Sequence, residues 1–298
     1  MDILTIIAGF AGGAFGAAFG SIPAFILTGV FALIGSILTL SGVTDYIVGN
    51  VAFGPFFGPH VSFAAGAAAA AYAANKAKKL DNAQNVLASL FGINDITTIL
   101  VGGIYGLVGI VAFTLITKQS VFVTDYPAFC VCIVLFLNRI ILGKTSIIGT
   151  LKDGEKREIF PKVEIIQNSV NGFLLSLGIA IIGQKLIEAG VSKDAMAIYP
   201  VFAFGISALS LIFLQMGYSI PITHHVTYPA ATVFILTQNI FLAAITGFIN
   251  AILWVIAGRI FNSHCDTYID PPAIVIACLL YTSPSPRDRT RSRMPSSA

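Results

Sequence analysis

Two histidines in matching sequence contexts are the residues of this chain best suited to chemistry. His60 begins the segment His-Val-Ser-Phe-Ala-Ala, and His225 begins the segment His-Val-Thr-Tyr-Pro-Ala. Both lie in apolar surroundings, where an ionisable side chain is a candidate functional residue. Because a histidine titrates near neutral pH, the pair suits proton coupling or the binding of a polar solute. A structural role, in which each ring bonds a carbonyl freed by a broken helix, stays open for both.

The residues around each histidine disfavour a continuous helix. Proline removes a backbone donor and restricts the residue before it, and irregular backbone at membrane depth is tolerated only where protein buries it or a cavity lines it. We therefore expect two broken or re-entrant segments, each ending at a helix N-terminus that faces a solute. The candidate pathway residues are His60, His225, Pro55, Gly58, Pro59, Ser62, Pro221, Thr223 and Thr227. His224 has no counterpart in the first segment and ranks below them.

Asp125 and Asp270 form a second matched pair, since proline follows each of them at the start of an apolar run. An N-cap is the ordinary role of such an aspartate. The functional alternative is a gate or a cation site at the mouth of a pathway. His264 and Asp266 lie shortly before Asp270, but this spacing is a weak metal signal, and we predict a solvated loop without a metal.

The composition of the chain places these residues in a membrane. Hydrophobic residues make up 56% of the sequence and charged residues 10%, with a mean hydropathy of +0.87. Soluble domains carry about 25% charged residues, so the sequence predicts an all-α polytopic membrane bundle of about ten helices. The expected spans are residues 3–20, 22–41, 58–75, 97–117, 124–142, 167–190, 196–216, 222–240, 241–261 and 271 onward. Motifs for nucleotides, cofactors or nucleic acid are absent, and no enzyme is predicted.

The matched pairs recur in the same order, which favours an internal duplication. We expect a first five-helix repeat over residues 1–142, a charged cytoplasmic linker over 143–163 and a second repeat over 164–277. Five spans are an odd number, so consecutive copies must have opposite orientations and form an inverted repeat. Lysine and arginine follow the third, fifth and ninth spans, which predicts the cytoplasmic membrane with the N-terminus outside.

Three further parts of the sequence lead to separate predictions. Residues 76–96 have no counterpart in the second repeat and are expected to form an amphipathic helix on the membrane surface. Arg139 ends the fifth span and is interpreted as a topology anchor. Residues 278–298 turn into a Ser/Pro/Arg tract that resembles a translated sequencing adapter, so a non-native tail is expected and the native second repeat is expected to continue past Ala277. The alternative is a disordered basic tail.

In general plan the chain resembles uncharacterised multi-pass permease-type proteins of bacterial inner membranes. It is similar in architecture to five-plus-five inverted-repeat transporters and channels of the urea-transporter type. The resemblance covers residues 1–277 and rests on no signature residue. It implies a small-solute transporter or channel with its pathway between the repeats, and the expected partners are the lipid bilayer and a small-molecule or ion substrate. A homo-oligomer is compatible with this plan.

The scarcity of acidic residues deep in the spans favours a neutral or weakly polar solute, or a symporter that uses histidine. Two other functions stay open. One is an integral membrane enzyme with His264, Asp266 and Asp270 at one surface, and the other is an accessory subunit without a pathway. Transport predicts that His60 and His225 meet in one cavity near the middle of the membrane.

Overall fold

The structure, a computed structural model, describes residues 1–119 and 124–281, and these residues are all-helical without a strand, as predicted. The helices are α1 (Ile3–Phe19), α2 (Ser21–Leu40), α3 (Ser62–Asn75), α4 (Ile96–Gln119), α5 (Tyr126–Leu142), α6 (Lys162–Glu188), α7 (Tyr199–Gln215), α8 (His224–Thr237), α9 (Ile240–Phe261) and α10 (Pro271–Tyr281). Each apolar segment expected from the sequence overlaps one of them. Residues 278–281 of the expected tail belong to α10, and 282–298 lie outside the described residues.

Within residues 1–119 and 124–281, five helical segments are long and apolar enough to cross a membrane. They are Ser21–Leu40, Ile96–Gln119, Lys162–Glu188, Ala195–Gln215 and Ile240–Phe261, and α1 and α5 are shorter apolar helices. Large apolar side chains cover the outside of the bundle, among them Leu4 at 73%, Ile140 at 66% and Phe241 at 70% exposed. Such an extensive apolar exterior would be unfavourable in water and indicates a membrane protein.

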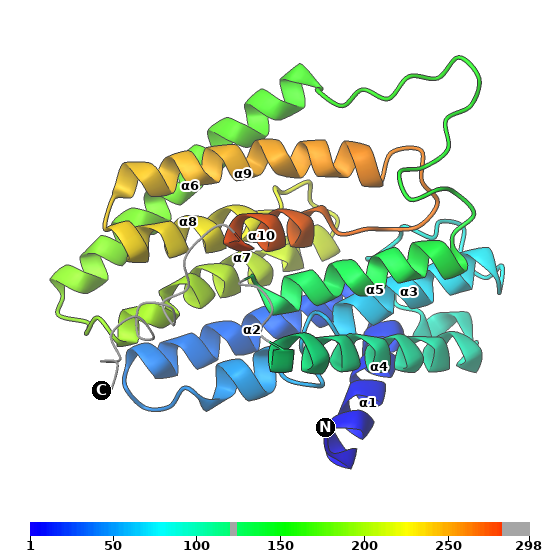
Figure 1. The fold of residues 1–298 in the computed structure, drawn as a ribbon, viewed down its shortest axis with the longest axis horizontal. Coiled ribbons are helices and arrows are strands. Elements are labelled where there is room, and N and C mark those ends of the chain that lie inside the picture. Colours follow the sequence, from blue (N-terminus) through cyan, green and yellow to red (C-terminus); the bar gives the residue numbers. More distant parts are fainter. Residues whose placement is uncertain (120–123, 282–298) are drawn as a thin grey trace, which may run out of the picture.

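The helices are arranged in layers (Figure 1). α6 and α9 pack together on one side of the bundle, and α1 and α4 pack together on the opposite side. Between these pairs lie α2, α3, α5, α7, α8 and α10, where α2 contacts α7 and α5 contacts α10. The two outer pairs therefore enclose the elements that carry most of the candidate site residues.

Glycines allow the outer helix pairs to touch backbone to backbone. A Cβ on Gly13 of α1 would collide with the carbonyl oxygen of Gly102 in α4, and a Cβ on Gly172 of α6 would lie 2.6 Å from the carbonyl oxygen of Gly247 in α9. Small residues in membrane helices permit this approach. Close contacts at glycines therefore form the outer helix pair in each half of the chain.

Residues 76–95 do not form the expected amphipathic helix, and that prediction is wrong. Their only regular element is a 3₁₀ turn at Phe91–Ile93. The side chain of Asn82 accepts a hydrogen bond from the amide of Gln84 at 2.8 Å, and that of Asn85 accepts one from the amide of Leu87 at 3.2 Å. Asparagine bonds of this kind compete with helical hydrogen bonding, which the apolar spacing alone did not reveal.

This segment packs onto the end of the bundle instead. The carbonyl of Val86 accepts a hydrogen bond from the amide of Ile22 at 3.0 Å, and the amide of Leu90 donates to the carbonyl of Ala17 at 3.2 Å. Leu90 is 1% exposed. The segment therefore holds the junction between α1 and α2 rather than lying on a membrane surface.

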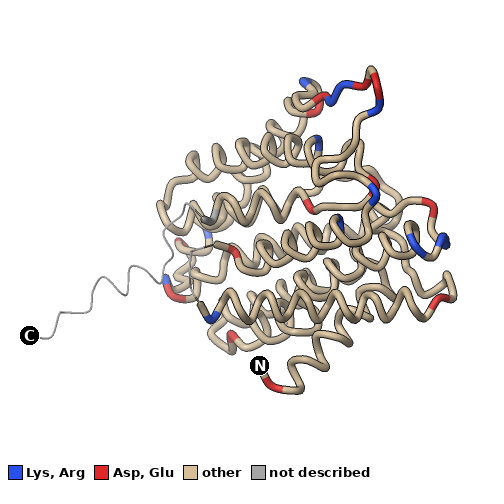
Figure 2. The backbone as a smooth tube through the Cα atoms, turned by 45° about the vertical axis from the view of Figure 1, so that its right-hand side comes forward, with Lys and Arg blue, Asp and Glu red and all other residues tan. Residues whose placement is uncertain are grey.

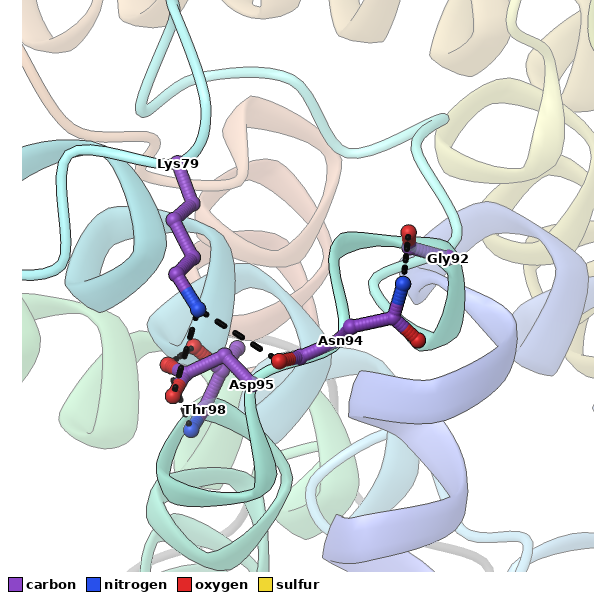
Figure 3. Close-up of polar contacts among 5 residues, drawn as sticks. All are labelled: Lys79, Gly92, Asn94, Asp95 and Thr98. Atoms are coloured by element: carbon purple, nitrogen blue, oxygen red, sulfur yellow. Dashed lines mark hydrogen bonds and ion pairs between the residues drawn. The ribbon is translucent and has the colours of Figure 1, made fainter.

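Asp95 marks where this segment turns into α4 (Figure 3). Its carboxylate accepts hydrogen bonds from the amide of Thr98 at 3.2 Å and from the Thr98 hydroxyl at 2.6 Å. Lys79 Nζ lies 3.9 Å from this carboxylate and donates to the carbonyl of Asn94 at 3.4 Å. The bonds from Thr98, with the Lys79 charge, hold the pKa of Asp95 below its ordinary value. Asp95 is thus an N-terminal capping carboxylate at the end of the bundle.

Candidate functional site

The first expected break lies between α2 and α3. A π-helical turn at Val48–Ala52 is followed by nonhelical backbone up to the start of α3. The carbonyl of Phe57 accepts hydrogen bonds from the hydroxyls of Thr28 at 2.6 Å and Ser62 at 3.1 Å. These bonds satisfy a polar group that would otherwise be unpaired in the apolar interior.

Glycines of α1 and α4 lie in direct contact with the backbone of this break. A Cβ on Gly16 would collide with the carbonyl oxygen of Ser62, and a Cβ on Gly109 would collide with the carbonyl oxygen of His60. The glycine stripes of the sequence therefore pack helices and also hold the irregular backbone in place.

The second expected break precedes α8, where residues 218–223 are nonhelical. Pro229 lies inside α8 and has no N–H to donate to the carbonyl of His225, four residues earlier. The Asn250 amide of α9 donates to that carbonyl at 3.0 Å. The neighbouring helix thus replaces the hydrogen bond that the proline removes.

The two predicted histidines are buried, and their rings stack on different outer helices. The His60 ring stacks on Phe113 of α4 at 4.4 Å between centroids, and the His225 ring stacks on Trp254 of α9 at 5.2 Å. Each ring therefore packs against the outer helix pair of its own half. The alternative role, bonding a freed carbonyl, is not seen for His60 either, since neither ring nitrogen has a hydrogen-bond partner among the described residues.

A cavity between the two halves is lined by the residues that precede these histidines. Pro59 and His224 both border it, and its volume is about 40 Å³. The lining comprises Phe25, Phe53, Pro59, Phe63, Asp125, Pro127, Ala128 and Val131 of the first half and Phe204, His224, Tyr228, Asp270, Ala273 and Ile276 of the second. Several of these residues, such as Asp125 and Asp270, occupy positions that the expected duplication pairs. Cavities between corresponding elements are common binding sites.

Both matched aspartates line this cavity, and both also cap a helix. Asp125 accepts a hydrogen bond from the amide of Ala128 at 2.8 Å and one from the hydroxyl of Tyr228 at 3.1 Å. Asp270 accepts from the amide of Ala273 at 2.9 Å and from the hydroxyl of Tyr268 at 2.8 Å. The capping role is therefore present, and the same two carboxylates border a cavity inside the bundle, where we expected acidic residues to be scarce.

The other predicted pathway residues lie around the breaks and not on the cavity. Thr227 shares a hydrogen bond of 2.8 Å with Ser207 of α7, and Gly58 packs beneath the His60 ring. Thr223 is buried at the start of α8, whereas Pro221 is exposed. Together with Pro55 and Ser62, they shape the two irregular segments.

The interfacial cluster of the enzyme alternative does not assemble in the structure. The Asp266 carboxylate accepts hydrogen bonds from Asn75 at 2.7 Å, the Lys144 amide at 2.8 Å and the Thr145 hydroxyl at 2.7 Å. Partial burial acts to raise the pKa of Asp266, but these bonds outweigh it and lower that pKa. His264 instead lies 3.3 Å from Glu155. Among the described residues, no three His, Cys, Asp or Glu side chains are grouped to hold a metal.

Sequence reasoning missed three important residues. His224 was ranked low and Tyr228 was treated only as a matched position, yet both line the cavity. Arg139, interpreted as a topology anchor, is 1% exposed and bonds the carbonyls of Ile147, Phe261 and Thr267. It fixes the linker and the loop before α10 to the end of α5.

Comparison with known proteins identifies the family but no function. Neither a functionally described protein nor a solved structure matches the chain. A family profile matches residues 1–161 and 179–282, which is most of the sequence. The chain therefore belongs to a family of unknown function (DUF7973).

Proposed function

We propose that the protein moves a small solute across the cytoplasmic membrane, as a transporter or channel, along a path between two inverted halves. The observation that carries this proposal is the cavity lined by corresponding residues of both halves. Asp125 and Asp270 are separated by the same 145 positions as Ala128 and Ala273. A site at the interface between repeats is the usual place for a transport pathway.

Helix packing supports the duplication. α1 packs on α4 as α6 packs on α9, and α3 packs on α4 as α8 packs on α9. α2 contacts its counterpart α7, and α5 contacts its counterpart α10. A twofold axis between two copies produces contacts of this kind. With five helices in each half, the copies are inverted and the chain crosses the membrane ten times, including the two broken segments.

The charges support an orientation with the N-terminus outside. The end of α3 and the loops before α6 and α10 meet at one end of the bundle, because Asp266 bonds Asn75, Lys144 and Thr145. The loop before α4 joins them there, because the Gln84 amide donates to the carbonyl of Asn262 at 3.1 Å. Figure 2 shows charged residues gathered in the loops, most densely in the linker before α6. We assign this end to the cytoplasm, following the positive-inside rule.

Aromatic rings from both halves meet at the cavity in this structure. Phe25 of the first half meets Phe204 of the second at 5.5 Å between centroids, and Phe53 also lies 5.5 Å from Phe204. Passage of a solute requires these rings to separate, which suits a gated channel or a transporter that alternates between two states.

The proposal predicts solute flux by the purified full chain in liposomes. Osmotic shock with urea, glycerol or methylammonium chloride, followed by light scattering, should give faster solute entry than in protein-free liposomes for at least one solute. Ala128→Phe fills the cavity and should reduce that flux to the protein-free rate. Val111→Phe places the same ring on the exposed face of α4 and should leave the flux unchanged.

Two results would count against the proposal. One is an absence of protein-dependent flux for every solute. The other is equal flux through folded Ala128→Phe and Val111→Phe, with folding judged by monodisperse elution in detergent.

A further inference from the structure

We infer that the cavity between the halves binds a small organic cation, such as an alkylammonium ion. This inference rests on the proposed function, whose substrate it specifies. Its basis is the combination of two carboxylates with several aromatic rings around one cavity.

The carboxylates Asp125 and Asp270 supply the negative charge. In each carboxylate, one oxygen accepts a hydrogen bond from a backbone amide and the other accepts one from a tyrosine hydroxyl. This arrangement suits an ionised carboxylate, which only accepts hydrogen bonds. The described residues that line the cavity include no lysine or arginine. Two carboxylates without a protein cation in an apolar interior favour the entry of a positively charged ligand.

The aromatic rings that line the cavity favour organic cations over small inorganic ones. The rings of Phe25 and Phe204 are inclined by 80° to each other, those of Phe25 and Phe63 by 55°, and those of Phe204 and Tyr228 by 75°. Rings set at such angles border the space from different directions. Organic ammonium groups bind well beside aromatic rings, whereas a small inorganic ion loses more hydration and finds few oxygen ligands here.

His224 is a further polar group of this cavity. It is 6% exposed, its ring lies 4.9 Å from that of Phe25, and its Nδ1 has no hydrogen-bond partner among the described residues. A buried polar atom without a protein partner is costly unless a ligand or water satisfies it. The unpaired nitrogen thus points to a ligand with a polar end as well as a cationic one, as in an amino alcohol.

The test compares charged and neutral probes on the purified full chain in detergent. Calorimetric titration with tetramethylammonium and choline chlorides, at ionic strength matched with sodium chloride, should show saturable binding. The neutral choline isostere 3,3-dimethylbutan-1-ol and sodium acetate should not bind. Asp125→Asn and Asp270→Asn keep a good capping residue and should each weaken cation binding by at least about tenfold. Asp95→Asn makes the same change at a capping site outside the cavity and should bind as the unchanged protein does.

Equal binding of the neutral isostere would overturn the inference, as would undiminished binding by both cavity variants or no binding of either cation. Flux measurements separate this failure from that of the proposed function. If urea or glycerol enters through the cavity while no cation binds, transport stands and the cation site is wrong. If no solute enters and no cation binds, both fail.

Discussion

Replacing Arg139 by methionine is expected to lower the free energy of unfolding by about 3 kcal/mol or more, because buried carbonyls lose their charged donor. The guanidinium donates to the carbonyls of Ile147 at 2.8 Å, Phe261 at 3.0 Å and Thr267 at 2.5 Å, and also to the Thr267 hydroxyl. Phe261 ends α9, where carbonyls lack helical partners and a cation is favourable. The change would therefore detach both the linker and the loop before α10 from the end of α5.

Unfolding by SDS in mixed micelles measures this loss. Arg259→Met is the control, because Arg259 pairs with Glu164 where both side chains are over one-third exposed, and such pairs contribute about 1 kcal/mol or less. Arg139→Lys retains the charge without the planar set of donors and should fall between the two. An equal loss in Arg139→Met and Arg259→Met would contradict the structural role of Arg139.

Replacing Asn250 by leucine is expected to destabilise the protein by about 1–2 kcal/mol, since the carbonyl of His225 loses the side-chain amide that donates to it. Pro229→Ala should relieve this loss. An alanine at position 229 regains the N–H that can donate to the carbonyl four residues earlier, as in an ordinary helix.

A double-mutant cycle in the same unfolding assay tests this compensation. The double variant should lose less stability than the sum of the two single variants, with a coupling of about 1 kcal/mol. Additive losses would mean that the Asn250 bond and the missing N–H of Pro229 are independent, and this account of the second break would be wrong.

The helices could be predicted from the sequence because a membrane helix must satisfy its backbone internally over a fixed length. The breaks were predictable for a related reason, since Pro55, Pro59 and Pro221 remove donors where no water replaces them. Residues 76–95 were not predictable in this way. Their apolar spacing suits a helix, but local bonds to Asn82 and Asn85 and packing onto α1 and α2 determine the observed conformation.

The predicted histidines each follow directly after a residue that lines the cavity, Pro59 before His60 and His224 before His225. Successive residues on a helix point about 100° apart, so a matched motif identifies the turn but not the side chain that faces a cavity. His225 packs against Trp254, while His224 faces the space between the halves. The position of Asp125 beside Tyr228 likewise depends on a contact between residues 103 positions apart, which no local pattern encodes.

The most direct test of the central claim, a water-accessible path between the two halves, is thiol labelling at matched positions. In a variant whose native cysteines are replaced, Ala128→Cys and Ala273→Cys place one thiol on each half of the cavity. Both should react with a membrane-impermeant methanethiosulfonate reagent during solute flux and lose that flux as they react. Val134→Cys, on α5 but away from the cavity and 0% exposed, should stay unreactive. If the cavity cysteines are as unreactive as Val134→Cys, no solute path runs between the halves.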